Sequence, residues 1–345
     1  MKAALVEKPG VLTVKDIPEP EMGDYDALCR VLFGATCVGT DQHIIHGRIF
    51  EGLQYPVVLG HESIGQVIKI GPKVRHYKEG DLVTRVGTLP SPNGQFDIAW
   101  GGFAEFGIAR DHWAMRRDGL PRQAWNNFRV NQLVSTGVDA ASATMIITWR
   151  ETLSYITRMG VQGGAKILVI GSGANGLAFT AHAGNLGANH IVQVGNFQRK
   201  ALALGLGANA YFDYKADDLA TLIEQANPEG FDFIIDVVGR QKVIDMFLPM
   251  LKPGGMIGVY GVDECDRMSF SYRKAKGSFV CYKGHYDEEE SHGQVVSFMR
   301  NGLLKAEHWL DMEHPFPLQD INKAFKAVVE RRLVKALVMI SSNPG

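Results

Sequence analysis

The feature that most constrains the fold is an apolar strand that runs directly into a glycine-rich loop and then into a helix. Residues 166–170 read Lys-Ile-Leu-Val-Ile, and the six residues that follow satisfy Gly-x-Gly-x-x-Gly before an alanine-rich helical stretch. The first glycine can make a tight turn, the second lets a ligand approach the backbone, and the third lets helix and strand pack closely. Free N–H groups at the start of that helix favour an anionic pyrophosphate. The pattern predicts a dinucleotide site at Gly171, Ser172, Gly173, Ala174, Asn175 and Gly176.

Strands and helices alternate after this loop. Further strands are predicted at 191–194, 231–238 and 256–260, with a helix at 199–207, which is typical of a doubly wound parallel sheet. Residues 2–86 instead form short alternating runs broken by Gly and Pro, which predict an all-β unit. A chain of 345 residues exceeds what one core usually supports. We therefore predict an α/β protein with a β-rich domain at 1–150 and a Rossmann domain at 151–285.

Composition excludes several kinds of partner. A net charge of −1 and 46% hydrophobic residues indicate a soluble globular protein without affinity for nucleic acid or a membrane surface. The first residues are too weakly apolar for a signal peptide, and no run of 18 apolar residues occurs, so a cytoplasmic location is expected. The four cysteines form no Cys-x-x-Cys pair. The acidic run at 287–290 is expected to be a solvated face.

The residues after the second strand bear on which nicotinamide cofactor is bound. An Asp or Glu about 20 residues beyond the glycine loop normally accepts hydrogen bonds from the ribose of NAD. No acidic residue stands between Leu177 and Phe212, and the expected position is occupied by Gly195 and Asn196, followed by Arg199 and Lys200. Because a 2′-phosphate would meet cations there and no carboxylate, we predict NADP in preference to NAD, with NAD still possible.

A second stretch, residues 56–74, carries the sequence Gly60-His61-Glu62 followed by Gly65, Gly71 and Val74. This spacing resembles the zinc signature of the medium-chain dehydrogenase/reductase superfamily, which includes zinc alcohol, polyol and sugar dehydrogenases, and the similarity extends over most of the chain. The resemblance implies that the β-rich domain is a GroES-like catalytic domain, that residues 286–345 return to it, and that the protein is a homodimer or homotetramer.

Catalytic zinc takes three protein ligands from Cys, His and Asp/Glu and keeps one open position. Cys37, His61 and Glu62 are candidates by type, although Glu62 could instead be hydrogen-bonded near the metal. Glu151 lies in a segment similar to the Glu-Pro-Leu-Ser of polyol dehydrogenases, which implies a fourth carboxylate; otherwise it is a helix-capping residue. Since no cysteine occurs between Cys37 and Cys265, the second, structural zinc of many family members is expected to be absent.

The segment after Cys37 departs from the family pattern. The family reads Cys-x-Ser/Thr-Asp, whereas this chain reads Cys37-Val-Gly-Thr-Asp41, with one extra residue. Counting forward from the preceding strand keeps Cys37 in the ligand position, and counting backward from Asp41 puts Val38 there. We favour Cys37 with a local bulge. Thr40 is then the hydroxyl that passes the substrate proton outward, His43 could continue the relay, and Asp41 braces the site. Lys335 is expected near the pyrophosphate.

The free energy needed to deprotonate an alcohol makes the metal decisive for alcohol oxidation. Deprotonating an alcohol of pKa near 16 at neutral pH costs roughly 12 kcal/mol, whereas zinc can bring a bound hydroxyl to a pKa of about 7. We therefore predict a zinc-dependent dehydrogenase that transfers a hydride between a secondary alcohol, polyol or sugar-like, and NADP or NAD. The alternatives are a zinc-free quinone or enone reductase of the same superfamily, which the Val38 alignment would favour, and a non-catalytic nucleotide-binding sensor.

Overall fold

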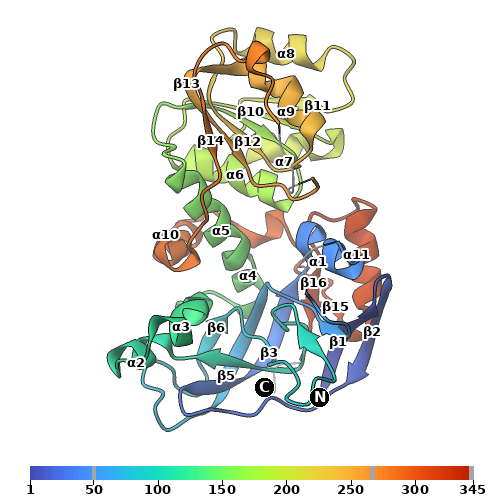
Figure 1. Cartoon of the computed structure of the whole chain (residues 1–345), viewed down its shortest axis with the longest axis vertical. Coiled ribbons are helices and arrows are strands. Elements are labelled where there is room, and N and C mark those ends of the chain that lie inside the picture. Colours follow the sequence, from blue (N-terminus) through green and yellow to red (C-terminus); the bar gives the residue numbers. More distant parts are fainter. Residues whose placement is uncertain (49–51, 265–268, 342–345) are drawn as a thin grey trace. The chain divides into compact units, whose positions relative to one another are not determined.

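A computed structural model describes residues 1–48, 52–264 and 269–341. The chain forms two compact units, one made of Met1–Ile147 and His292–Gly345 and the other of Thr148–Ser291 (Figure 1). The chain passes between the units within two helices, α5 (Met145–Arg158) and α10 (Glu288–Arg300). The first unit is therefore discontinuous in sequence, because the C-terminal residues return to it.

The first unit is built on two β-sheets. The smaller sheet has the order β2-β1-β4-β7, and the larger has β15-β16-β3-β5-β6 with β8 also paired to β3. Apolar side chains from the larger sheet and from helix α11 meet in one core, where Phe103 and Phe325 pack edge to face. The strands are β1 (Lys2–Lys8), β2 (Val11–Asp16), β3 (Asp26–Ala35), β4 (Val57–Val58), β5 (Ser63–Ile70), β6 (Leu82–Thr84), β7 (Asp97–Ile98), β8 (Phe106–Arg110), β15 (Phe316–Pro317) and β16 (Leu337–Met339).

Two pairings in this unit position the residues of interest. Strand β16 runs antiparallel to the end of β3, with Leu337 opposite Ala35, so Lys335 comes close to the segment that carries Cys37. Strand β5 also pairs with β3, and Ser63 lies opposite Gly34. The helices of this unit are α1 (Val38–Ile45), α2 (His112–Arg117), α3 (Arg122–Trp125), η1 (Asn126–Val130), α4 (Ala140–Ala143), η5 (Ala306–His308), η6 (Leu318–Asp320) and α11 (Ile321–Val329).

The second unit contains a six-stranded sheet in which every pairing is parallel (Figure 1). Its order, β11-β10-β9-β12-β13-β14, is the 3-2-1-4-5-6 order of a doubly wound dinucleotide fold. The predicted α/β class is therefore confirmed. The strands are β9 (Lys166–Ile170), β10 (His190–Gly195), β11 (Ala210–Asp213), β12 (Phe231–Asp236), β13 (Leu251–Val259) and β14 (Val280–Tyr282).

Helices of the second unit connect these strands, as parallel pairing requires. They are α6 (Ala174–Asn185), η2 (Phe197–Arg199), α7 (Lys200–Gly205), α8 (Leu219–Ala226), α9 (Gln241–Phe247), η3 (Leu248–Met250) and η4 (Tyr272–Lys274). The order reverses between β9 and β12, the point where doubly wound sheets bind ligands at the carboxyl ends of their strands. Across both units, no helix within the described ranges is long and apolar enough to cross a membrane.

The acidic run at 287–290 is only in part the solvated face that was predicted, because Glu290 is exposed whereas Glu288 is buried. Glu288 is only 7% exposed, and its Oε2 accepts a 2.6 Å hydrogen bond from the fully buried guanidinium of Arg150. Glu290 accepts hydrogen bonds from Ser154 and Arg158. Glu288, Glu289 and Glu290 occupy the first turn of α10, where carboxylates interact favourably with the helix dipole. The burial of Glu288 was not predictable from local sequence, because its partner Arg150 lies on α5, far away in the chain.

Candidate active site

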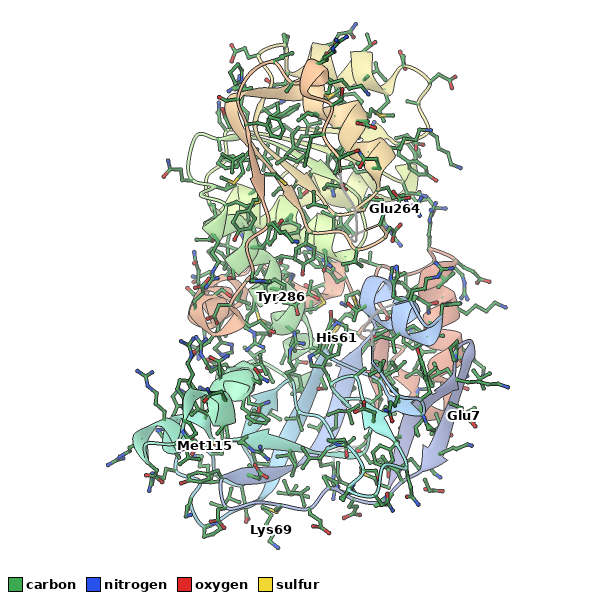
Figure 2. All side chains as sticks on the ribbon, viewed as in Figure 1. Glu7, His61, Lys69, Met115, Glu264 and Tyr286 are labelled. Atoms are coloured by element: carbon green, nitrogen blue, oxygen red, sulfur yellow. The ribbon has the colours of Figure 1, made fainter. Side chains whose placement is uncertain are left out.

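Three potential metal ligands converge in the first unit. Cys37 follows β3 and precedes α1, whereas His61 and Glu62 lie in the bend between β4 and β5. Three potential ligand atoms lie within 4.8 Å of one another: the sulfur of Cys37, a ring nitrogen of His61 and a carboxylate oxygen of Glu62. His61, labelled in Figure 2, and Glu62 are buried. The bend itself requires Gly60, whose φ is +102° and whose missing Cβ would collide with the backbone of Phe103.

Asp41 fixes the orientation of this cluster. Its Oδ2 accepts a 2.8 Å hydrogen bond from the backbone N–H of Cys37, and its Oδ1 lies 3.3 Å from Nδ1 of His61. The other ring nitrogen, Nε2, lies 3.7 Å from Oε1 of Glu62. A carboxylate held against one nitrogen of an imidazole sets the ring orientation and makes the other nitrogen the better ligand. Asp41 therefore lies where a brace for His61 would lie, and its role toward a metal stays a prediction.

The charges of the cluster fit a divalent cation. Burial lowers the pKa of His61, but Asp41 and Cys37 outweigh burial and raise this pKa well above its ordinary value. The buried ammonium of Lys335 pairs with Glu62, and although burial lowers the pKa of Lys335, the charges of Glu62 and Cys37 raise it. A metal-binding thiolate and two carboxylates would then face one ammonium. A metal-binding nitrogen of His61 carries no proton, so the imidazole is neutral. The thiolate, the two carboxylates and the ammonium then sum to a charge of −2, which a dication neutralises.

The glycine loop of the second unit has the geometry that its sequence predicts. Gly171 ends β9 with φ +112°, and a Cβ on Gly173 would meet nothing within 4 Å, so a ligand can approach the backbone there. A Cβ on Gly176 would collide with the carbonyl of Gly171, which keeps α6 close to the strand. Nε2 of Gln193 donates a 2.9 Å hydrogen bond to that carbonyl from β10. Helix α6 thus begins at an open loop suited to phosphate.

Comparison with known proteins assigns the family. Residues 23–119 match the model of the alcohol dehydrogenase GroES-like domain, and residues 174–291 match the model of the zinc-binding dehydrogenase. The chain belongs to the zinc-binding medium-chain dehydrogenase superfamily. It is 28% identical to an L-threonine 3-dehydrogenase of Enterobacter sp. (strain 638) over 326 residues, which cover 91% of this chain and 92% of the relative.

Solved structures of this superfamily share the fold. An alcohol dehydrogenase from Thermus sp. ATN1 superposes with a TM-score of 0.80 at 22% identity, covering 98% of this chain and 99% of that one. The 2R,3R-butanediol dehydrogenase from Bacillus subtilis gives the same TM-score and coverage at 21% identity. These likenesses show the fold, and the two family models identify the protein as a zinc-binding, alcohol-type dehydrogenase.

Within this dehydrogenase, the extra residue after Cys37 does not displace the sulfur from the cluster. Cys37 is the N-cap residue of α1, and Asp41 N–H donates to its carbonyl at 3.0 Å, so the insertion is absorbed in the first helical turn. Val38 is 40% exposed as the first residue of that helix. The geometry thus favours the alignment that puts Cys37 in the ligand position.

The remaining predicted residues of the first unit lie on α1 and near β16. Thr40 and His43 are three residues apart on α1 and therefore share one side of it. Nδ1 of His43 lies 2.6 Å from the carbonyl of Gly39, which leaves Nε2 as the proton acceptor. Lys335, predicted to contact the pyrophosphate, instead has its ammonium on Glu62 and is 1% exposed. Its role toward the cofactor stays a prediction.

Glu151 belongs to the second unit, on helix α5. Its Oε2 accepts a 3.1 Å hydrogen bond from the hydroxyl of Tyr260, which follows β13. The ring of Tyr260 packs edge to face on Tyr155 and Phe179, so the hydroxyl is held by an aromatic cluster. Sequence reasoning did not identify Tyr260, although its position after a parallel strand is a signal for proximity to the ligand. Ligation by Glu151 stays a prediction.

At the end of β10, Gly195 and Asn196 occupy the position where an acidic residue is common. The neighbouring strand β11 places Asp213 opposite Gly195. Asp213 lies one residue beyond Phe212, where the stretch without acidic residues ends, and it was therefore not considered in the sequence-based prediction. Asp213 accepts a 3.1 Å hydrogen bond from the backbone N–H of Lys215. Arg199 ends the short helix η2 that begins directly after Asn196. The cations named from the sequence thus follow the strand end in space as well as in sequence.

Proposed function

We propose that this protein oxidises a secondary alcohol of the polyol or sugar type and reduces NADP, or runs the reverse carbonyl reduction. The observation that carries the proposal is the group of sulfur, nitrogen and oxygen ligand atoms of Cys37, His61 and Glu62 within 4.8 Å. This donor set, with Asp41 behind the imidazole, matches what catalytic zinc takes from a protein. We propose one zinc per chain, with Glu151 as an additional carboxylate.

Zinc, when bound, supplies the electrostatic stabilisation that makes a hydroxyl acidic near neutral pH. Cys37, His61 and Glu62 would hold it, while Asp41 keeps the ring of His61 oriented and Lys335 balances the charge of Glu62. Thr40 would accept the substrate proton, and Nε2 of His43, an acceptor because Nδ1 faces a carbonyl, would carry it outward. The hydride would pass to the nicotinamide ring of the cofactor. The N-terminus of α6 would bind the pyrophosphate of the same cofactor.

NADP is the proposed cofactor because the end of β10 carries Gly195 and Asn196 without a side-chain carboxylate, with Arg199 and Lys200 following. The names of the relatives suggest a substrate panel. L-Threonine and 2R,3R-butanediol are both secondary alcohols with a heteroatom on the neighbouring carbon. We therefore propose vicinal diols, amino alcohols and cyclic polyols as the first substrates to examine.

The test begins with elemental mass spectrometry of the purified protein. We expect about one zinc per chain in the wild type, loss of that zinc in Cys37→Ala, and retention of it in the matched control Val38→Ala. Turnover of the panel with NADP should follow the zinc content. A wild type that takes up no zinc even when zinc is supplied, and that reduces quinones or enones, would refute the proposal. Cofactor binding without any turnover would favour a nucleotide sensor.

A further inference from the structure

We infer that Ser172 and Tyr211 determine cofactor specificity by excluding any side chain at position 195 and by holding the loop that follows it. The inference rests on the NADP preference proposed above and assigns it to two residues that are not phosphate ligands themselves. Both lie in the second unit, Ser172 in the glycine loop and Tyr211 on β11. Each is a positioning residue, because it acts through the backbone of residues 195–199.

The first observation is steric. A Cβ built on Gly195 would lie closer than 3.0 Å, a separation real Cβ atoms essentially never show, to Oγ and Cβ of Ser172 and to Oη of Tyr211. Rotating the serine hydroxyl does not remove its Cβ, and Tyr211 is itself buried. Gly195 is therefore obligatory with these neighbours. Neither aspartate nor glutamate can occupy the strand end where the ribose of NAD is usually recognised.

The second observation is the hydrogen bonding of Asn196. Its backbone N–H donates to Oγ of Ser172 at 2.9 Å, and its carbonyl accepts from Oη of Tyr211 at 2.6 Å. The same carbonyl accepts from the N–H of Arg199 at 2.9 Å, and the Asn196 side chain accepts from the N–H of Gln198 at 2.9 Å. Asn196 is thus fixed on both sides and starts helix η2, which presents Arg199.

These two observations give Ser172 and Tyr211 one combined effect. They exclude a carboxylate from position 195, where it would repel a 2′-phosphate, and they fix the backbone from which Arg199 and Lys200 extend. A nucleotide with a 2′-phosphate gains binding free energy from an ordered cationic loop, whereas NAD has no phosphate at that position for the loop to bind. Loosening the loop should therefore weaken NADP binding selectively, while adding a side chain at 195 should disturb both cofactors.

The hydrogen-bond arm uses Ser172→Ala and Tyr211→Phe in the full-length protein. Dissociation constants for NADPH and NADH are measured by fluorescence titration, which requires no turnover. Each variant loses one hydrogen bond to Asn196, so we expect NADPH affinity to fall about 5- to 10-fold and NADH affinity to change less than about twofold. Equal losses for the two cofactors would overturn the inference. A wild type that binds NADH more tightly would instead overturn the proposed NADP preference.

The steric arm compares Gly195→Ala in the wild type and in a Ser172→Gly/Tyr211→Phe background. Overpacking in the wild type should weaken NADH binding on the order of tenfold, and the loss should be several-fold smaller in the background, since both colliding groups have been removed. Gly205→Ala is the matched control, because a Cβ there meets nothing within 4 Å. The same loss in both backgrounds would overturn the steric assignment, whatever the cofactor preference proves to be.

Discussion

Replacing Asp236 by asparagine is expected to stabilise the second unit near neutral pH but not near pH 4. Asp236 ends β12 and is 0% exposed. Its Oδ1 accepts hydrogen bonds from the N–H groups of Val238 and Gly239 at 2.8 and 3.1 Å. Among the described residues, none donates a hydrogen bond to Oδ2. Burial raises the pKa of Asp236 from 3.8 to about 6, against the lowering effect of the two N–H groups.

The shift of about two pKa units corresponds to about 3 kcal/mol, at roughly 1.36 kcal/mol per unit. Because the folded pKa lies above the unfolded one, the folded state binds more protons between about pH 4 and 6. In the wild type, the contribution of Asp236 to the free energy of unfolding is therefore fully present below pH 4 and is lost as the pH rises through 6. Asparagine keeps an oxygen for both N–H donors and does not titrate. The stability of Asp236→Asn minus that of the wild type should rise by about 3 kcal/mol from pH 4 to 7.

Hydrogen exchange read by mass spectrometry on peptides from β9 and β12 isolates this unit within the full chain, since amides of core strands report the opening of their own cooperative region. Free energies of opening are compared for the two proteins at pH 4, 5, 6 and 7. Asp217→Asn, which alters an exposed carboxylate of the same unit, is the control and should give no such trend. A difference that stays flat with pH, or that falls as pH rises, would refute the reasoning.

Two further predictions concern the second unit. Gly176→Ala should weaken NADPH binding on the order of tenfold or more, because its Cβ meets the Gly171 carbonyl, whereas Gly184→Ala, with nothing nearer than 3.8 Å, should not; equal titration curves would contradict this. Arg150→Leu should lower the free energy of unfolding by about 3–5 kcal/mol, because it removes the buried cation from the Arg150–Glu288 ion pair, and the double variant Arg150→Leu/Glu288→Leu should lose less stability. Urea unfolding measures both, and a double variant as unstable as the single one would contradict the argument.

Much of the fold follows from local pattern. A strand followed by Gly-x-Gly-x-x-Gly and a helix has few physical solutions, and short runs broken by Gly and Pro indicate a β-rich domain, so both halves of the chain were predictable. Gly171 and Gly176 show why: their roles depend on backbone geometry within a single turn, which the spacing of residues specifies. The zinc signature around His61 is similarly local, since two ligand types adjacent in sequence stay adjacent in space.

Only the tertiary structure decided which distant groups meet. The sequence allowed Cys37 or Val38 in the ligand position, and the choice depends on how the first turn of α1 absorbs the extra residue against Asp41. Lys335 and Glu62 are 273 residues apart in sequence, and they pair because β16 lies beside β3, which no local spacing encodes. Likewise, Gly195 is constrained by Ser172, which follows β9, and by Tyr211 on β11. Local spacing specifies turns, whereas burial and long-range pairing specify which charges face one another.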